Sequence, residues 1–215
     1  MDWAASQPIH GIVLPKVDSA EAVLAADARL KDQGAAAEIL IWCMIETPRG
    51  VLNTAQIADA TNRMGGLVAG TSDLVKDLRA KHTPDRAPLY HALSQIVLAA
   101  RAAEIACLDG GHLDLNDDVG LAASCQQGLE FGFDGKTLIH PKQIEVANRI
   151  FAPSADEIAW AEKISAAFQD AAESGAGVVV VDGKLVEQLH VDEATRLLSL
   201  ASQISSQIAS QVASQ

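Results

Sequence analysis

The sequence predicts an α/β protein built on a parallel β-sheet, and two observations indicate this class. Short apolar runs alternate with stretches whose apolar residues recur at helical spacing, the pattern of successive strand and helix units. Each apolar run ends in polar residues or glycine, and in such folds the carboxyl ends of the strands face the active site. The 215-residue chain is 49% hydrophobic, which is enough to bury a core. We therefore expect the chemistry at one rim of the sheet.

Five strands with helices between them follow from the order of these runs. The strands are predicted over residues 11–15, 39–45, 67–69, 105–108 and 137–139. The helices are predicted over residues 19–33, 54–64, 90–103 and 124–130. Gly65 and Gly66 are expected to end the second of these helices before the third strand begins.

The composition changes after Pro141 and indicates a small C-terminal appendage. A helix is predicted over residues 153–174 and another over residues 192–202. Between them, Asp182-Gly183 predicts a hairpin turn joining strands 178–181 and 184–186. The expected organisation is a main catalytic domain at 1–150, the appendage at 151–202 and a Ser/Gln-rich tail at 203–215, to which no function is assigned.

Charge and cysteine content exclude several classes of partner. The net charge of −12, without a cluster of Lys and Arg, argues against nucleic acid and anionic membrane surfaces. No apolar stretch approaches the roughly 20 residues that span a bilayer, and the start lacks a signal-peptide pattern. The three cysteines have no C-x-x-C spacing, which favours reduced, buried thiols. We expect a cytoplasmic protein.

Two acidic residues at strand ends carry the chemical prediction. Glu46 follows the apolar run ILIWCMI, and Asp73 lies in GGLVAGTSDL. Two carboxylates at one rim suit Mg²⁺, which prefers oxygen ligands and keeps positions open for substrate. The structural alternative for each is a helix N-terminal acid or cap.

Several segments together closely resemble the citrate lyase beta-subunit-like family, within the group of HpcH/HpaI aldolases and malyl-CoA lyases. The segments are GIVLPKVDSAEAV, IETPRGVLN, AGTSDL, AARAAEIACLDG, GFDGKTLIHPKQIEVAN and FAPS, in the family's order from about Gly11 to about Arg196. The resemblance implies a TIM (β/α)8-type barrel and a Mg²⁺ held by Glu46 and Asp73. It also implies reversible carbon–carbon cleavage of a 3-hydroxyacyl thioester, presented by CoA or an acyl carrier, with a 2-oxo acid or acetyl product.

The chain departs from the family pattern at its start. The family's barrel has three further strand-helix units ahead of GIVLPK, including a strand-end arginine that binds the substrate carboxylate. The expectation is therefore a barrel lacking its first three β/α units. Five strands cannot close an eight-stranded barrel, so its open edges would need cover from another chain.

The remaining site residues are expectations of the same kind. Arg49 is assigned a catalytic role, since a cation in a helix's first turn is electrostatically unfavourable for structure alone. Contacts to substrate or CoA are expected from Lys16, Thr47, Gly70, Thr71, Ser72 and His140. Gly70-Thr71-Ser72 offers backbone amides and hydroxyls to a developing oxyanion. Lys16 is equally compatible with a solvated residue, and His140 with a packed loop histidine. Asp109 takes part in the site or fixes a loop, and the following Gly110-Gly111 favours the loop.

One catalytic residue is assigned to the C-terminal segment. Relatives carry an aspartate after the hairpin that reaches a neighbouring subunit's site as an acid or base, and Glu187 stands at that position here. This assignment implies a homo-oligomer.

Three functions are compatible with these observations. The first is a Mg²⁺-dependent lyase acting on a citryl-, malyl- or methylmalyl-type thioester. The second is an aldolase cleaving a 4-hydroxy-2-oxo acid to pyruvate, although that branch uses an early His/Arg site that the chain does not contain. The third is a catalytically degenerate barrel with an assembly role or none.

Overall fold

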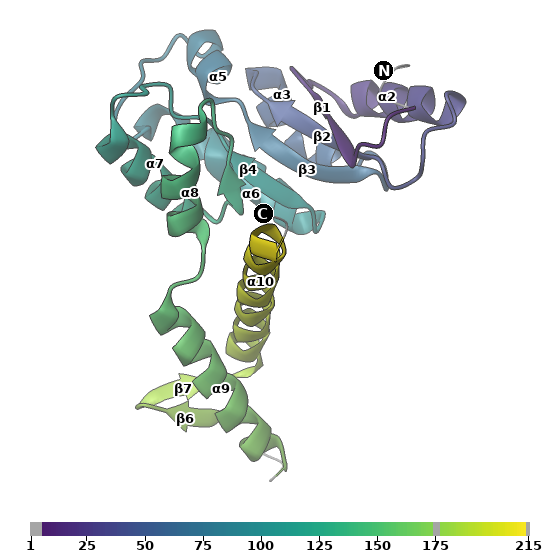
Figure 1. Cartoon of the computed structure of the whole chain (residues 1–215). Coiled ribbons are helices and arrows are strands. Elements are labelled where there is room, and N and C mark those ends of the chain that lie inside the picture. Colours follow the sequence, from purple (N-terminus) through teal and green to yellow (C-terminus); the bar gives the residue numbers. More distant parts are fainter. Residues whose placement is uncertain (1–5, 174–176, 214–215) are drawn as a thin grey trace. The chain divides into compact units, whose positions relative to one another are not determined.

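The computed structural model describes residues 6–173 and 177–213 (Figure 1). Its internal contacts divide the chain into two compact units, Met1–Phe151 and Ala152–Gln215, which are considered separately.

The first unit is built on a five-stranded parallel sheet. The strands are β1 (Gly11–Leu14), β2 (Leu40–Ile45), β3 (Met64–Ala69), β4 (Ala106–Asp109) and β5 (Gly135–Lys136). They pair in sequence order, β1-β2-β3-β4-β5, and Figure 1 shows β1 to β4 side by side. All five carboxyl ends therefore lie at one rim.

Helices connect the strands. They are α2 (Ala20–Asp32), α3 (Pro48–Leu52), α4 (Thr54–Ala58), α5 (Thr71–Asp77), η1 (Ala87–Leu89), α6 (Tyr90–Ala102), α7 (Asp118–Phe131), η2 (Pro141–Gln143) and α8 (Ile144–Phe151). Local sequence explains several boundaries: the Asp117 carboxylate accepts the Gly120 amide at the start of α7, and Gly132, with φ +95°, ends it.

The hydrophobic core lies between one face of the sheet and the helices. In β2 the alternate residues Ile41, Cys43 and Ile45 are fully buried, and they cluster with Leu30 of α2 and Ile96 of α6, among others. Because side chains alternate across a strand, Trp42, Met44 and then Glu46 lie on the opposite face. In a parallel β/α architecture, that face carries the site residues at its rim.

Two predictions about these elements were wrong. The fifth strand is Gly135–Lys136 and not 137–139. Gly65 and Gly66 lie inside β3, which begins at Met64, so the preceding helix ends well before residue 64. The reason is the Trp42 indole on the neighbouring strand: a Cβ atom at Gly66 would lie 2.4 Å from it, so only glycine fits there.

The second unit consists of α9 (Ala155–Glu173), β6 (Val179–Val181), β7 (Lys184–Val186) and α10 (Gln188–Ala213). Ser154 and Glu157 cap α9 reciprocally. The predicted hairpin is confirmed: β6 and β7 are antiparallel, and Asp182 and Gly183 both adopt positive φ, as a type I′ turn requires.

A separate small core holds this unit together. It contains Ala161, Ile164, Val181, Val186 and Ala194. Helix α10 continues through 203–213, where the sequence had suggested a tail, and residue 174 of the predicted helix lies outside the described residues. Within the described part of the chain, no helix is long and apolar enough to cross a membrane.

Candidate functional site

Glu46 is the buried member of the candidate site. It directly follows β2, its exposed fraction is 5%, and its Oε1 accepts the backbone N–H of Lys16 at 2.7 Å. Lys16 adopts a positive φ of 50° just after β1, which helps turn this amide toward the neighbouring strand. The carboxylate is therefore held by the rim of the adjacent strand.

Asp73 lies in the first turn of α5, which follows β3. Its Oδ2 is 2.9 Å from the Lys16 ammonium, and the two side chains are 39% and 55% exposed. The hydrogen bond from Lys16 lowers the pKa of Asp73, and the charges of Lys16 and Lys76 lower it further. In turn, the hydrogen bond to Asp73 raises the pKa of Lys16, with a contribution from the Glu46 charge. Residues 16, 46 and 73 thus form one cluster.

Gly70 explains how the two carboxylates can approach. A Cβ atom at this position would lie 2.1 Å from Glu46 Cβ and 2.7 Å from Glu46 Oε2. Glycine is required because the chain between β3 and α5 passes directly over the Glu46 side chain. Thr71 is buried behind this turn, and Ser72 is exposed.

The residues present fit a Mg²⁺ ion. Two carboxylates that follow adjacent strands supply hard oxygen ligands, and the absence of a Cβ at Gly70 lets the Glu46 side chain lie directly against the turn that leads to Asp73. Among residues 6–173 and 177–213, no group of three or more His, Cys, Asp or Glu side chains could hold a metal. A metal held by Glu46 and Asp73 would therefore keep most of its coordination positions for substrate and water.

A cavity of about 320 Å³ opens beside Lys16, between the end of β1 and one face of α2. Its lining is mainly apolar and includes Leu14, Pro15, Val17, Ala22, Ala25 and Ala26, with Arg29. Lys16 therefore belongs both to the cavity and to the carboxylate cluster.

Thr47 has a structural role at the rim. Its hydroxyl accepts the Gly50 amide as the cap of α3 and donates to the Asp18 carboxylate. Asn53 also binds this segment by donating to the Asp18 carbonyl at 2.7 Å. Asp18 and Asn53 escaped the sequence analysis, because a single polar residue in a loop gives no sign of its partner.

Two other expected residues belong to the first unit and one to the second. Arg49 is exposed in the first turn of α3. His140 follows β5, where its Nδ1 accepts the Lys142 amide and caps η2. Glu187 is exposed in the second unit, between β7 and α10.

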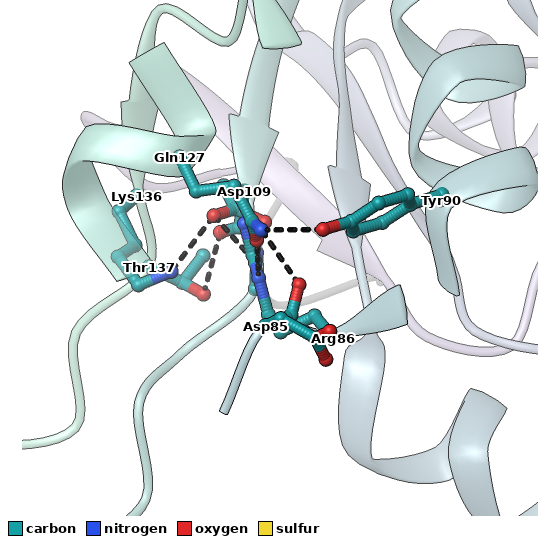
Figure 2. Close-up of polar contacts among 8 residues, drawn as sticks. Asp85, Arg86, Tyr90, Asp109, Gln127, Lys136 and Thr137 are labelled. Atoms are coloured by element: carbon teal, nitrogen blue, oxygen red, sulfur yellow. Dashed lines mark hydrogen bonds and ion pairs between the residues drawn. The ribbon is translucent and has the colours of Figure 1, made fainter. Parts of the chain in front are cut away.

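A buried charge network also lies at the rim, and the sequence analysis identified only Asp109 from it. Asp109 ends β4, and Figure 2 shows Arg86 and Lys136 reaching its carboxylate from different elements. Arg86 also donates to Gln127 of α7 at 2.6 Å. Charged residues next to strands were the available signal, but their pairing joins distant segments and cannot be read from the sequence.

The fold and the carboxylate pair together define an α/β protein with a candidate divalent-cation site at the rim of a parallel sheet. Residues 2–141 match the HpcH/HpaI aldolase/citrate lyase family, and the chain belongs to that family.

Named relatives are similar over most of the chain. A (3S)-malyl-CoA thioesterase from Cereibacter sphaeroides is 44% identical over 201 residues, covering 94% of this chain and 68% of the relative. The citrate lyase subunit beta of Leuconostoc mesenteroides is 36% identical over 199 residues, covering 90% and 66%. The crystal structure of CitE from Mycobacterium tuberculosis with magnesium, acetoacetate and coenzyme A is 29% identical, with a TM-score of 0.71 and coverage of 92% and 70%.

Proposed function

We propose that this protein catalyses Mg²⁺-dependent cleavage or formation of a carbon–carbon bond in a 3-hydroxyacyl thioester of the malyl-CoA or citryl-CoA type. The observation that carries the proposal is the carboxylate cluster at the rim: the Lys16 amide donates to Glu46 after β2, and the Lys16 ammonium contacts Asp73 after β3, the neighbouring parallel strand. Relatives named for malyl-CoA and citrate, and a relative solved with magnesium and coenzyme A, support the same substrate class.

Each rim residue has a role in this proposal. Glu46 and Asp73 would hold the ion, which when bound supplies Lewis-acid stabilisation of developing negative charge. Lys16, beside both carboxylates and the cavity, contributes a cation that can contact an anionic part of the substrate. Arg49, in the first turn of α3, is proposed as a further catalytic residue, and His140, which caps η2, as a further contact to substrate or CoA.

The proposed carbon–carbon cleavage requires no oxidant or reductant. In the cleavage direction the substrate hydroxyl loses its proton to a base, and the electrons of the adjacent carbon–carbon bond pass to the thioester. The thioester enolate then takes a proton, giving an acetyl thioester and a 2-oxo acid. Glu187, supplied by a neighbouring subunit, is the proposed acid or base, so the active form is a homo-oligomer.

Thioester hydrolysis is the second candidate, and the 44% identity to a (3S)-malyl-CoA thioesterase favours it. Water would then add to the thioester carbonyl and the carbon–sulfur bond would break, releasing the free acid and the CoA thiol. The same rim could bind the substrate for either reaction.

One assay separates the two reactions. The purified protein is incubated with malyl-CoA and Mg²⁺, and the 2-oxo acid and the free thiol are quantified separately. The lyase forms glyoxylate without free thiol, whereas the thioesterase forms thiol without glyoxylate. Chelation with EDTA should abolish either product.

Variants of the carboxylates test the site itself. Glu46→Gln and Asp73→Asn should each weaken Mg²⁺ binding by at least about tenfold, since loss of a supporting group alone commonly costs that much. Glu38→Gln, which removes the same charge from an exposed loop, is the control and should bind Mg²⁺ like the wild type. A folded wild-type protein that neither binds Mg²⁺ nor turns over malyl-CoA contradicts the proposal and favours the degenerate alternative.

A further inference from the structure

Asp109 is the centre of a buried ionic network behind the candidate site. The carboxylate is fully buried, and Arg86 Nη1 donates to both of its oxygens at 2.8 Å (Figure 2). Lys136, whose side chain is also fully buried, donates to Oδ2 at 2.8 Å. The Gly110 amide donates to Oδ1 at 2.8 Å. All four groups converge at the ends of β4 and β5.

Forming this network requires charged groups to lose their hydration, which costs free energy. Burial lowers the pKa of Lys136, and the attraction of Asp109 opposes that effect only in part. A hydrophobic cluster of the same volume is often as stable as a buried ion pair, so stability is a weak explanation for its presence. Precise placement of the attached backbone is the better explanation in this fold.

The network reaches the candidate metal site through Gly110. A Cβ atom at Gly110 would lie 2.4 Å from Thr71 Oγ1 and 2.7 Å from the Ala69 carbonyl oxygen. The end of β4 is therefore in direct contact with the end of β3 and the first residue of α5. Asp109 fixes Gly110 through its amide, and Gly110 limits where Thr71 can lie.

The other end of α5 is connected to the same carboxylate. α5 ends at Asp77, and the following segment leads to Arg86, which adopts a positive φ of 55° where η1 begins. η1 contacts α5, and Arg86 is held by Asp109 and by Gln127. The helix that carries Asp73 is thus restrained from both ends by Asp109.

We infer that Asp109 is a positioning residue for the metal site: through Gly110 and Arg86 it holds α5 so that Asp73 meets Glu46. The inference rests on the proposed function, because it assumes that Glu46 and Asp73 bind Mg²⁺. It predicts that a residue with no contact to the ion controls the affinity for it.

The test measures metal affinity in the full-length protein. Asp109→Asn removes the charge but keeps the shape, and Mg²⁺ binding is measured by calorimetry, with Mn²⁺ binding by electron paramagnetic resonance. The dissociation constant should rise about 10–100-fold, the usual effect of losing a group that orients a metal ligand. Circular dichroism at the assay temperature establishes that the variant is folded.

Asp134→Asn is the matched control. Asp134 also binds an arginine, Arg101, through both oxygens and accepts a backbone amide of β4, that of Cys107. Among the described residues, the side-chain partners of Asp134 lie in α6 and β4 and not in α5 or η1. A purely structural effect lowers the melting temperature of both variants, whereas a positioning effect raises the metal dissociation constant only for Asp109→Asn.

Arg86→Lys is the second variant, for the case in which Asp109→Asn does not fold. It keeps the charge, but a single ammonium replaces the Nη1 and Nε groups that contact Asp109 and Gln127, and it should also weaken metal binding. A folded Asp109→Asn or Arg86→Lys protein with wild-type affinity, or equal loss in Asp134→Asn, overturns the inference. Failure of the wild type to bind Mg²⁺ instead contradicts the proposed function and removes the basis of the inference.

Discussion

Gly70 is the residue on which the geometry of the two carboxylates depends most directly. Because its Cα lies against the Glu46 side chain, Gly70→Ala should force the β3–α5 turn and Glu46 apart. We expect a loss of about 1–3 kcal/mol in the free energy of unfolding, the usual cost of overpacking, together with weaker Mg²⁺ binding. Urea unfolding and metal titration of the variant measure these two effects.

Gly111 provides the control for this substitution. It lies at the same rim after β4, but the nearest atom to a Cβ there would be the Thr137 carbonyl oxygen at 3.4 Å, an ordinary contact. Gly111→Ala should therefore leave stability nearly unchanged or slightly raised. Equal stability of the two variants would show that Glu46 can move away at no cost.

The sequence was sufficient to place Glu46 and Asp73 after strands, but not to identify the residues that contact them, and their role as metal ligands stays a prediction. Both follow apolar runs, and the strand-end rule applies to each without knowledge of the other. The Lys16 amide and the Asp109 network act across the sheet, between segments that are distant in sequence. A pattern of local periodicity contains no information about such pairs, and only folding brings them together.

At the scale of elements, Asp27 and Arg63 connect α2 to the amino ends of β2 and β3. Asp27 is buried, its Oδ1 is 3.1 Å from Arg63 Nε, and Lys31 and Thr61 donate to Oδ2. Arg63 also donates to the carbonyls of residues 36, 37 and 39, which precede β2. This pair therefore joins α2, the segment before β2 and the start of β3 at the end of the sheet opposite the candidate site.

We expect Asp27→Asn to reduce the free energy of unfolding by about 3 kcal/mol at pH 7, because it leaves a buried guanidinium unpaired. Burial raises the pKa of Asp27, but Lys31, Thr61 and Arg63 together lower it below 3.8. The carboxylate of Asp27 takes up a proton at a higher pH in the unfolded chain than in the folded protein. Its stabilisation of the fold is therefore complete above the pKa of the unfolded chain and is lost as the pH falls through the pKa of the folded protein. Urea unfolding at pH 7 and pH 3 should show a smaller difference from the wild type at pH 3.

Lys31→Met is the comparison for this element. Lys31 contacts the same carboxylate at 2.8 Å, but its side chain is 63% exposed. An exposed partner contributes about 1 kcal/mol at most. If Lys31→Met lowers the free energy of unfolding as much as Asp27→Asn does, the burial of Arg63 is not the cause of the large loss expected for Asp27→Asn.

Elements with a local signal were predicted well, and elements decided by neighbours were not. The hairpin at Asp182-Gly183 is confirmed because its turn chemistry is contained in two residues. Gly65-Gly66 was read as a helix stop, although these residues are strand positions whose small size accommodates Trp42 of the next strand. Strand β5 was misplaced because it has only two residues and pairs with Leu108 and Asp109.

At the scale of the whole molecule, the proposed catalytic groups belong to two separate cores. Glu46 and Asp73 lie in the unit ending at Phe151, whereas Glu187 lies in the unit that begins at Ala152. Under the proposed function, Glu187 acts in the site of a neighbouring subunit. That arrangement makes a prediction about mixtures of chains.

Glu46→Gln and Glu187→Gln proteins should each be inactive alone but active when assembled together. A site is intact where a chain with Glu46 meets a neighbour with Glu187. Random assembly gives this combination at about a quarter of the sites, and tandem purification raises the share by removing single-variant oligomers, to about half for a dimer, so about a quarter to a half of the wild-type rate should return. The two variants are co-expressed with different tags, purified in tandem and assayed with malyl-CoA.

A mixture of Glu46→Gln with Asp73→Asn is the control. Both substitutions affect proposed metal ligands that must come from one chain, so no activity should return. If activity returns in neither mixture although the mixed oligomer is purified, any role of Glu187 lies within its own chain. If activity returns in both mixtures, Glu46 and Asp73 need not belong to one subunit.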